Sequence, residues 1–263
     1  MDGFVRVGEV DEERLDRSRR IGWLNLDAIA RARILMVGAG ALGNEVGKCL
    51  ALSGFRHVTV VDMDHVVGSN LNRCLFFSKE DASGRRLKAE VVAQGMNALS
   101  PDMEAVPVPT RIEEMSDPGF HDHDVVLGCL DNIAARLHVN ARAYQAGRVY
   151  IDGGMEGLTG KVMVVRPPKG ACIQCGMNRS HARVAGLRFS CTGKDVVFHE
   201  PRLAAEITTT SIVSALMVRE AVKHVSGRGE MLLANTLYYD GQRNVAEEAE
   251  VQVNPDCPVH GGI

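Results

Sequence analysis

The stretch Arg33-Ile-Leu-Met-Val-Gly38-Ala-Gly40-Ala-Leu-Gly43 decides the fold of this chain. An apolar run of strand length leads directly into three glycines, and an apolar-periodic segment follows from Asn44 to Ser53. This order predicts a strand, a glycine turn and a helix. Glycines at this spacing permit a tight turn, close approach of the backbone to phosphate, and packing of the helix on the strand. Because the first turn of a helix also offers unpaired N–H groups to an anion, the stretch predicts a nucleotide-binding loop.

A second apolar run, His57-Val-Thr-Val-Val-Asp62, predicts the next strand and ends in an acidic residue. In a strand–turn–helix–strand unit, an acid at this position binds a ribose hydroxyl of the nucleotide. The two segments together predict a nucleotide-binding protein without identifying its reaction. A nicotinamide-dependent dehydrogenase fits them equally well.

Strand and helix patterns continue to alternate along the chain, which predicts a mainly parallel sheet with helices on both faces. The expected helices are Arg85–Leu99, Asn132–Ala146 and Leu203–Val225. The expected strands are Met103–Pro109, Asp124–Cys129 and Val149–Asp152, and two last strands are expected to flank Tyr239–Gln242. The segment from Gly160 to Arg166 is expected to begin a more irregular part. The polar segment Asn178–Pro201 predicts a long loop, and loops of that length are usually functional or mobile.

The expected fold class is α/β, with a Rossmann-like open sheet that is mostly parallel and is extended by C-terminal antiparallel strands. We expect a single domain over residues 1–263. Its expected parts are an arginine-rich helix over residues 9–31, a nucleotide-binding core over residues 33–155, and a third part over residues 172–260 with the crossover loop and the last strands.

Two short motifs far apart in the sequence predict a metal site. Cys172-Ile-Gln-Cys175 and Cys257-Pro-Val-His260 each place two soft ligands three positions apart, the spacing with which a tight turn holds one tetrahedral zinc. Thiolate and neutral imidazole both bind zinc, so the exchange of one Cys for His is chemically neutral. A single CxxC motif is also compatible with redox chemistry. The alternative to a zinc site is that these four residues are unrelated to one another. We expect the zinc to fasten the C-terminal segment to the body and to perform no chemistry.

The composition excludes several classes of function. The chain has 263 residues, 45% of them hydrophobic, and a formal net charge of −3, so it has ample core and no overall attraction to nucleic acid or to an anionic membrane. No apolar stretch reaches the roughly 20 residues that span a bilayer, and the acidic N-terminal segment does not resemble a signal peptide. Seven cysteines, an odd number with metal-type spacing, favour a reducing compartment, so we expect a cytoplasmic protein.

The segment after the second strand is the most specific part of the sequence. It reads Asp62-Met-Asp64-His-Val-Val-Gly-Ser-Asn70-Leu-Asn-Arg73. This run resembles the DxDxVxxSNLxR signature of the MoeB/ThiF/HesA family, the prokaryotic relatives of ubiquitin-activating enzymes. A dehydrogenase has no need of this arginine and asparagine cluster, whereas an adenylating enzyme must hold three phosphates while a carboxylate attacks the α-phosphate. The resemblance extends from the arginines near the N-terminus to the CxxC and CxxH motifs.

The resemblance implies a nucleotide-binding role for a set of residues around the glycine turn. The loop glycines would be Gly38, Gly40 and Gly43. Asp62 would bind the ribose, Asn70 and Arg73 would contact phosphates, and Asp64 would either join the same set or only orient Arg73.

Three further positions carry family roles. Lys88, in Gly84-Arg-Arg-Leu-Lys88, would be the phosphate-binding lysine, although the family's usual glycine-to-lysine spacing is one residue shorter. Asp131 would coordinate magnesium and hold the reacting end of the substrate. Arg14 and Arg17 match an RxxR motif, in which the second arginine would reach the triphosphate of a partner subunit.

Each of these three positions also has a simpler interpretation. Arg14 and Arg17 would otherwise form a solvated helix face, and Lys88 would be an ordinary surface lysine. Asp131 would cap the helix that begins at Asn132, a role that is compatible with metal binding.

Cys191, in Phe189-Ser-Cys191-Thr-Gly-Lys194, lies in the long polar loop, which is where the family carries its acceptor cysteine. A thiol with an ordinary pKa of about 8.5 needs a lower pKa to attack at neutral pH, and Arg188 and Lys194 would supply the positive charge. We expect Cys191 to take the acyl group as a thioester or to relay sulfur. The alternative is an inert loop thiol.

The resemblance thus implies an enzyme that requires ATP and Mg²⁺ and contains Zn²⁺. Its substrate would be the C-terminal Gly-Gly carboxylate of a ubiquitin-like modifier or sulfur-carrier protein. The enzyme would be a homodimer, and a conjugating enzyme or a sulfurtransferase would be a further partner. Adenylation of a peptide or of a tRNA-borne carboxylate would use the same nucleotide residues without an acceptor cysteine. An NAD-dependent dehydrogenase and a non-catalytic scaffold that binds a nucleotide are two further candidate functions.

Overall fold

A computed structural model describes residues 12–176 and 204–260 of the chain, and its centre is one eight-stranded sheet in the order β3-β2-β1-β4-β5-β6-β7-β8. Strands β3, β2, β1, β4 and β5 pair in parallel, and β6, β7 and β8 continue the sheet with antiparallel pairing. The strands are β1 (Arg33–Val37), β2 (His57–Val61), β3 (Glu104–Val108), β4 (Val125–Gly128), β5 (Val149–Glu156), β6 (Thr159–Val165), β7 (Thr236–Asp240) and β8 (Val245–Ala249). The expected parallel core with antiparallel C-terminal strands is therefore confirmed.

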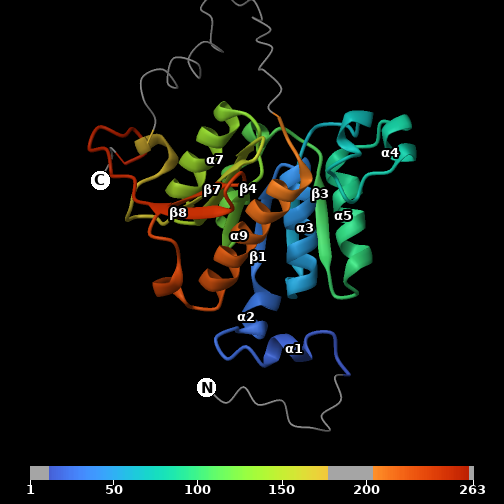
Figure 1. Cartoon of the computed structure of the whole chain (residues 1–263), viewed down its shortest axis with the longest axis horizontal. Coiled ribbons are helices and arrows are strands. Elements are labelled where there is room, and N and C mark those ends of the chain that lie inside the picture. Colours follow the sequence, from blue (N-terminus) through green and yellow to red (C-terminus); the bar gives the residue numbers. More distant parts are fainter. Residues whose placement is uncertain (1–11, 177–203, 261–263) are drawn as a thin grey trace, which may run out of the picture.

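Helices cover both faces of this sheet (Figure 1). Since neighbouring residues of a strand point to opposite faces, Ile34 and Met36 of β1 pack with α3, α5 and α9, whereas Leu35 and Val37 pack with α7. The helices are α1 (Asp16–Arg19), α2 (Leu26–Arg31), α3 (Ala41–Ser53), α4 (Lys79–Ser83), α5 (Lys88–Leu99), α6 (Asp117–His121), α7 (Ile133–Gln145) and α9 (Ile207–Val225). Short 3₁₀ turns are η1 (Gly68–Asn70), η2 (Ile112–Glu114), η3 (Ile173–Gly176) and η4 (Gly229–Met231). In the described residues, none of the helices combines the length and hydrophobicity that a membrane crossing requires.

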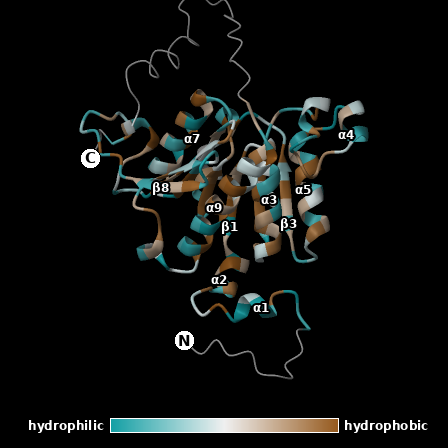
Figure 2. Ribbon diagram, viewed as in Figure 1, coloured by the Kyte–Doolittle hydropathy of each residue, from teal (hydrophilic) through white to brown (hydrophobic). Residues whose placement is uncertain are grey.

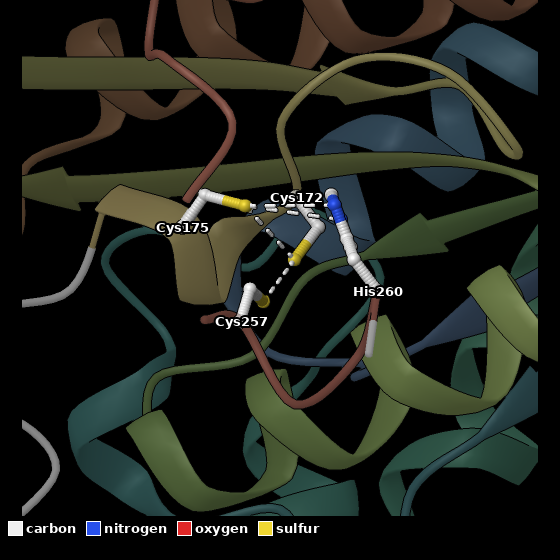
Figure 3. Close-up of side chains that lie close together, drawn as sticks. All are labelled: Cys172, Cys175, Cys257 and His260. Carbon is white, nitrogen blue, oxygen red and sulfur yellow. Dashed lines mark hydrogen bonds between the residues drawn. The ribbon is translucent and has the colours of Figure 1, made fainter. Parts of the chain in front are cut away.

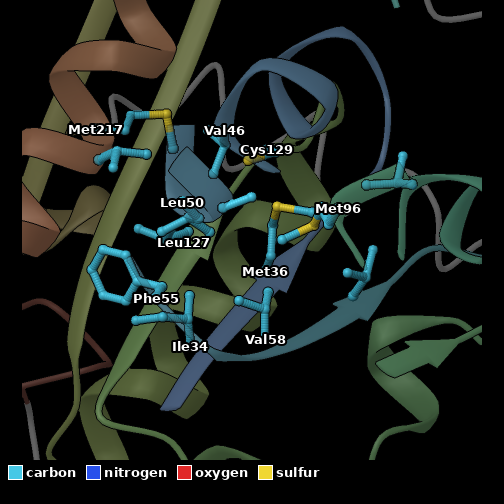
Figure 4. Close-up of a cluster of buried hydrophobic side chains, with 14 of the residues drawn as sticks. Ile34, Met36, Val46, Leu50, Phe55, Val58, Met96, Leu127, Cys129 and Met217 are labelled. Atoms are coloured by element: carbon cyan, nitrogen blue, oxygen red, sulfur yellow. The ribbon is translucent and has the colours of Figure 1, made fainter. Parts of the chain in front are cut away.

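The larger hydrophobic core lies between the sheet and helices α3, α5 and α9 (Figure 4). Leu50, Phe55 and Met96 are completely buried there. Each such side chain contributes about 1.5–3 kcal/mol relative to an exposed position. Figure 2 shows hydrophobic residues concentrated in β1 and along the helices that line it. This core holds the strand ends, and the loops that follow them, in a fixed arrangement.

Four expectations for secondary structure need correction, and one of them is the start of α5, which lies at Lys88 rather than Arg85. The segment expected as one helix over residues 9–31 contains the two short helices α1 and α2, and Asn25 starts the second by accepting a hydrogen bond from the Ala28 N–H group (3.0 Å). The part from Gly160 to Arg166, expected to be irregular, is the regular strand β6, because β5 and β7 pair with it on both sides. The last helix begins at Ile207 rather than Leu203, since Glu206 caps it. The expected loop Asn178–Pro201 lies outside the described residues.

The glycine turn after β1 leaves no room for a side chain at two of its positions, Gly38 and Gly43. Gly38 has a φ of +100°, and a Cβ atom there would lie 2.4 Å from the carbonyl oxygen of Cys129. A Cβ atom on Gly43 would lie 2.1 Å from the carbonyl oxygen of Gly38. Around Gly40, in contrast, a Cβ atom would meet nothing within 4 Å. Gly38 and Gly43 therefore serve the packing of the turn, and Gly40 faces open space at the start of α3.

We expect Gly43→Ser to lower the free energy of unfolding by about 1–3 kcal/mol, because its Cβ atom overlaps the backbone of Gly38 and the turn has to move. The matched variant Gly40→Ser adds the same atoms in open space and should change the free energy by less than about 0.5 kcal/mol. Chemical denaturation of both variants provides the comparison. Equal stability of the two would contradict the close approach of Gly38 and Gly43.

Candidate active site and zinc site

The register of the parallel strands brings three loops together at one edge of the sheet. Val37 of β1 pairs with Val61 of β2 and with Gly128 of β4, so the three strands end at the same level. The glycine turn, Asp62 and the loop over residues 129–132 leave the sheet at this edge. In open α/β sheets, ligands bind outside the carboxyl ends of the parallel strands.

Asp62 connects the glycine turn to the segment that follows β2. Its Oδ2 atom accepts a hydrogen bond from the Ala39 N–H group (2.7 Å), and its Oδ1 atom accepts one from the Asp64 N–H group (2.8 Å). Burial raises the pKa of Asp62, although Lys88 and these two hydrogen bonds act in the opposite direction. Each carboxylate oxygen keeps a second lone pair, which a hydroxyl group of a nucleotide can use.

Lys88 is held at the same edge through its backbone and its side chain. It is the first residue of α5, and its N–H group donates to the Asp64 carbonyl oxygen (2.8 Å). Its Nζ atom lies 2.9 Å from Asp64 Oδ2, and its side chain is only 13% exposed, so Lys88 is not an ordinary surface lysine. The helix α5 starts at Lys88 rather than near Arg85. The extra residue between Gly84 and Lys88, relative to the family's usual spacing, therefore lies before the helix.

Three carboxylates act electrostatically on the charge of Lys88. Burial alone would lower the pKa of Lys88, but the carboxylates of Asp62, Asp64 and Asp131 outweigh burial and raise it. Lys88 therefore stays a cation at physiological pH. The structure thus brings Asp62, Lys88 and Asp131 together, and it shows Asp64 bound to Lys88 rather than orienting Arg73.

Asp131 is exposed in the loop that follows β4. The interpretation of Asp131 as a helix cap is wrong, because Asn132 caps α7 by accepting a hydrogen bond from the Ala135 N–H group (2.8 Å). Asp131 is therefore available to a ligand. Magnesium is usually bound by one or two carboxylates together with phosphates of the substrate, and the Asp131 carboxylate is a donor of this kind.

Asn70 ends η1, and Arg73 lies in the turn that follows it. Asn70 Oδ1 accepts a hydrogen bond from the Val67 N–H group (3.2 Å). Arg73 Nη1 donates to the Ser69 carbonyl oxygen (2.6 Å) and to Asn72 Oδ1 (2.9 Å). Both side chains thus help to shape the turn that carries them.

Asn44 is a site residue that the sequence reasoning missed. It is completely buried in the first turn of α3. Its Nδ2 atom donates to the carbonyl oxygens of Ala39 (3.1 Å) and Gly40 (2.9 Å), and its Oδ1 atom accepts from the Phe76 N–H group (2.9 Å). Asn44 therefore joins the glycine turn to the segment after Arg73. The available signal was a polar residue directly after the last loop glycine, because a buried amide requires partners.

Arg14 and Arg17 lie far from the site of their own chain. Arg14 Nη1 donates to the Ala51 carbonyl oxygen (3.1 Å), near the end of α3 that is opposite the glycine turn. Figure 1 shows α1 below the sheet, beyond the starts of the strands. Since α3 has 13 residues and a helix rises about 1.5 Å per residue, the separation is about 20 Å. A role of Arg17 in the site of a partner subunit is still a prediction.

The cysteine and histidine motifs form one cluster (Figure 3). Each motif is a tight turn, since the Cys175 N–H group donates to Cys172 O and the His260 N–H group donates to Cys257 O, both at 3.0 Å. Cys172 Sγ lies 3.9 Å from Cys175 Sγ and 3.7 Å from Cys257 Sγ, and Cys175 Sγ lies 3.7 Å from His260 Nε2. Two thiolates on a tetrahedral zinc are separated by about 3.8 Å, given Zn–S bonds of about 2.3 Å. The four residues therefore fit zinc, as expected.

Helix α7 supports this cluster from one side. The ring of Tyr144 stacks on the ring of His260 at 4.7 Å, and its hydroxyl group donates to the Pro168 carbonyl oxygen (2.8 Å). Burial raises the pKa of the Cys172 thiol, and the nearby Cys175 and Cys257 raise it further. Zinc stabilises thiolates, so metal binding here would release protons and would tie the C-terminal segment to the body.

We expect about one zinc per chain in the purified protein, and removal of the metal by a chelator should lower the melting temperature by at least about 5 °C. Cys257→Ser should reduce the metal content and cause a similar loss, because it removes a buried ligand. Cys49→Ser, which removes a half-buried thiol outside the cluster, should keep the zinc. Elemental analysis and calorimetry provide the measurements. A metal-free protein of full stability would refute the zinc assignment.

The sequence of this chain is similar to those of known proteins over almost its whole length. The ThiF family model matches residues 14–259. The sulfur carrier protein adenylyltransferase of Thermus thermophilus is 30% identical over 262 residues, which are 95% of this chain and 92% of that protein.

Eukaryotic relatives match over a shorter segment. The SUMO-activating enzyme subunit uba-2 of Caenorhabditis elegans is 38% identical over 57% of this chain and 26% of that protein. The NEDD8-activating enzyme E1 catalytic subunit of Dictyostelium discoideum is 33% identical over 56% of this chain and 36% of that protein. The matched part is thus about a quarter to a third of these longer proteins.

A solved structure supports the fold. MccB of E. coli, crystallised with AMPCPP and MccA, superimposes with a TM-score of 0.75 and 20% sequence identity over 95% of this chain and 75% of that chain. This likeness concerns the arrangement of the elements alone. The family match and the nearly full-length relative together show that this chain belongs to the ThiF family.

Proposed function

We propose that this enzyme uses ATP to adenylate the C-terminal Gly-Gly carboxylate of a ubiquitin-like modifier or a sulfur-carrier protein. The observation that supports the proposal most is the convergence of Asp62, Lys88 and Asp131 beside the glycine turn. One relative of similar length is a sulfur carrier protein adenylyltransferase, and two longer proteins that match over part of their length are subunits of SUMO-activating and NEDD8-activating enzymes. These names support one substrate class, a ubiquitin-like modifier or a sulfur-carrier protein.

In the proposed reaction, a carboxylate oxygen of the tail attacks the α-phosphorus of ATP, and the bond from this phosphorus to pyrophosphate breaks. The products are an acyl adenylate and pyrophosphate. The start of α3 offers N–H groups to the phosphates, Lys88 and Arg73 supply positive charge, and Asp62 binds the ribose. Magnesium at Asp131 would supply further neutralisation of phosphate charge. The chain thus acts mainly by positioning and by electrostatic stabilisation.

The proposal assigns the following step to Cys191, which lies outside the described residues. Burial raises the pKa of Cys74 to about 11 and also raises the pKa of Cys49 and of Cys129, so these thiols stay protonated at neutral pH. The other three cysteines belong to the zinc cluster. In a thioester step, the thiolate of Cys191 attacks the acyl carbon, and AMP leaves. Relay of sulfur through a disulfide or persulfide of Cys191 is the alternative use of the same thiol.

The proposal also includes a homodimer in which Arg17 of one subunit serves the triphosphate site of the other. The position of α1 at the far end of α3 supports this, because Arg17 is exposed and too distant for its own site. A conjugating enzyme or a sulfurtransferase would accept the activated carrier. The proposal places the protein in a reducing compartment such as the cytoplasm, because cysteines that are spaced as zinc ligands are typical of such compartments.

The primary test is exchange of labelled pyrophosphate into ATP, with the Gly-Gly carriers encoded in the same genome as substrates. Exchange should require the intact Gly-Gly tail. Lys88→Ala and Asp131→Asn should reduce the rate by about 10²–10³-fold, because each removes charge that stabilises the transferred group. Lys79→Ala, which removes an exposed lysine of the neighbouring helix α4, should leave the rate unchanged. Exchange that proceeds equally well with tailless carriers or only with short peptides would contradict the proposed substrate.

Cys191→Ala separates activation from transfer. The variant should keep pyrophosphate exchange and should lose the covalent enzyme–carrier adduct, since only the second step requires the thiol. Mass spectrometry of the enzyme after incubation with ATP and carrier detects the adduct. An adduct that persists in the variant would rule out Cys191 as the acceptor.

A further inference from the structure

Arg136, in the first turn of α7, binds the backbone of the loop after β4 and of the neighbouring strand β5. Its Nε and Nη2 atoms donate to the Leu130 carbonyl oxygen, at 2.9 and 2.6 Å. Its Nη2 atom also donates to the Gly153 carbonyl oxygen of β5 (2.8 Å), and its Nη1 atom lies 3.1 Å from Asp152 Oδ2. One guanidinium group therefore connects the loop after β4 to the neighbouring strand β5.

The contact with Leu130 bears directly on Asp131. The carbonyl group of Leu130 and the N–H group of Asp131 belong to one planar peptide unit, so two hydrogen bonds to that oxygen fix the orientation of the plane. The plane in turn limits the directions that the Asp131 side chain can take. Asp131 is exposed, and among the hydrogen bonds and ion pairs found within residues 12–176 and 204–260, no contact of its carboxylate takes over this role.

A buried carboxylate keeps Arg136 in place. Asp152 is only 3% exposed, and its Oδ1 atom accepts a hydrogen bond from the Tyr150 hydroxyl group (2.8 Å). Tyr150 is itself completely buried, and its side chain packs against Gly128 of β4. A Cβ atom on Gly128 would lie 2.3 Å from the hydroxyl oxygen of Tyr150. Tyr150 thus holds Asp152, Asp152 holds Arg136, and Arg136 holds the peptide between Leu130 and Asp131.

Fold stability alone is a weak explanation for this arrangement. Desolvation offsets most of the attraction within a buried ion pair, and well-packed apolar residues often hold a fold equally well. A fixed carboxylate, however, is an advantage at a reactive site, where a displacement of about 1 Å can cost about 10²-fold in rate. Groups that hydrogen-bond around metal ligands typically contribute about 10–100-fold to metal affinity.

We propose that Arg136 is a positioning residue that orients Asp131 toward the magnesium ion of the bound magnesium–ATP complex. The inference rests on the proposed function, because it takes Asp131 as the magnesium ligand. Arg136 acts through the peptide of Leu130 and does not itself touch the nucleotide.

The test is calorimetric titration of the full-length protein with ATP, with magnesium present and with magnesium chelated. In the unaltered protein, magnesium should tighten ATP binding. Arg136→Gln should reduce that tightening by about tenfold or more, while the affinity for magnesium-free ATP changes by less than about twofold. Arg136→Lys keeps the charge and one hydrogen bond and should restore part of the effect.

Arg148→Gln is the matched control. Arg148 also donates to a backbone carbonyl oxygen, that of His121 (2.7 Å), but it lies just before the start of β5, at the opposite edge of the sheet from Asp131. This variant should show the full effect of magnesium. Circular dichroism verifies that each variant is folded. If Arg136→Gln does not fold, Arg136→Lys and Tyr150→Phe must each show a smaller loss of the magnesium effect, with an unchanged affinity for magnesium-free ATP.

The possible outcomes distinguish this inference from the proposed function. An unchanged effect of magnesium in folded Arg136 variants would overturn the inference, and so would ATP binding by the unaltered protein that does not respond to magnesium. If magnesium tightens ATP binding and Arg136→Gln removes the effect, but no carrier supports pyrophosphate exchange, the role of Arg136 stands and the proposed substrate fails.

Discussion

The parallel pairing of β1 with both β2 and β4 is the constraint on which the rest of the structure depends. Because Val37, Val61 and Gly128 are aligned, the glycine turn, Asp62 and Asp131 meet at one edge although they are far apart in the sequence. The hydrophobic core under α3, α5 and α9 holds these strands in register. The turn itself tolerates no side chain at Gly38 or Gly43, so its backbone closely approaches both the helix and the loop after β4.

The charged groups around Lys88 carry an excess of negative charge. Asp62, Asp64 and Asp131 outnumber Lys88, and a triphosphate would add more negative charge. Two unit charges about 4 Å apart interact by about 4 kcal/mol near a protein surface, so ATP binding needs further cations. Arg73, a magnesium ion and an arginine of a partner subunit are the cations that the proposed function brings in. In their absence the Lys88–Asp64 ion pair keeps the lysine at the edge of the site.

Local patterns in the sequence were sufficient for the strand–glycine–helix unit, the signature after β2 and the two zinc motifs, because each depends on neighbouring residues. Long-range pairing was not accessible in the same way. The sequence does not reveal that β5 and β7 make a strand of Thr159–Val165, that Asn132 rather than Asp131 caps α7, or that Asn44 binds Phe76. Arg136 and Asp152 were missed for the same reason, since their partners lie on different elements.

A crystal structure of the protein with magnesium and an ATP analogue that cannot be cleaved at the α-phosphate tests the central claim most directly. The account predicts that the phosphates lie against the start of α3 near Gly40, that Lys88 contacts them, and that the Asp131 carboxylate coordinates the metal. A nucleotide bound elsewhere, or an Asp131 side chain that points away from the metal and the phosphates, would contradict it.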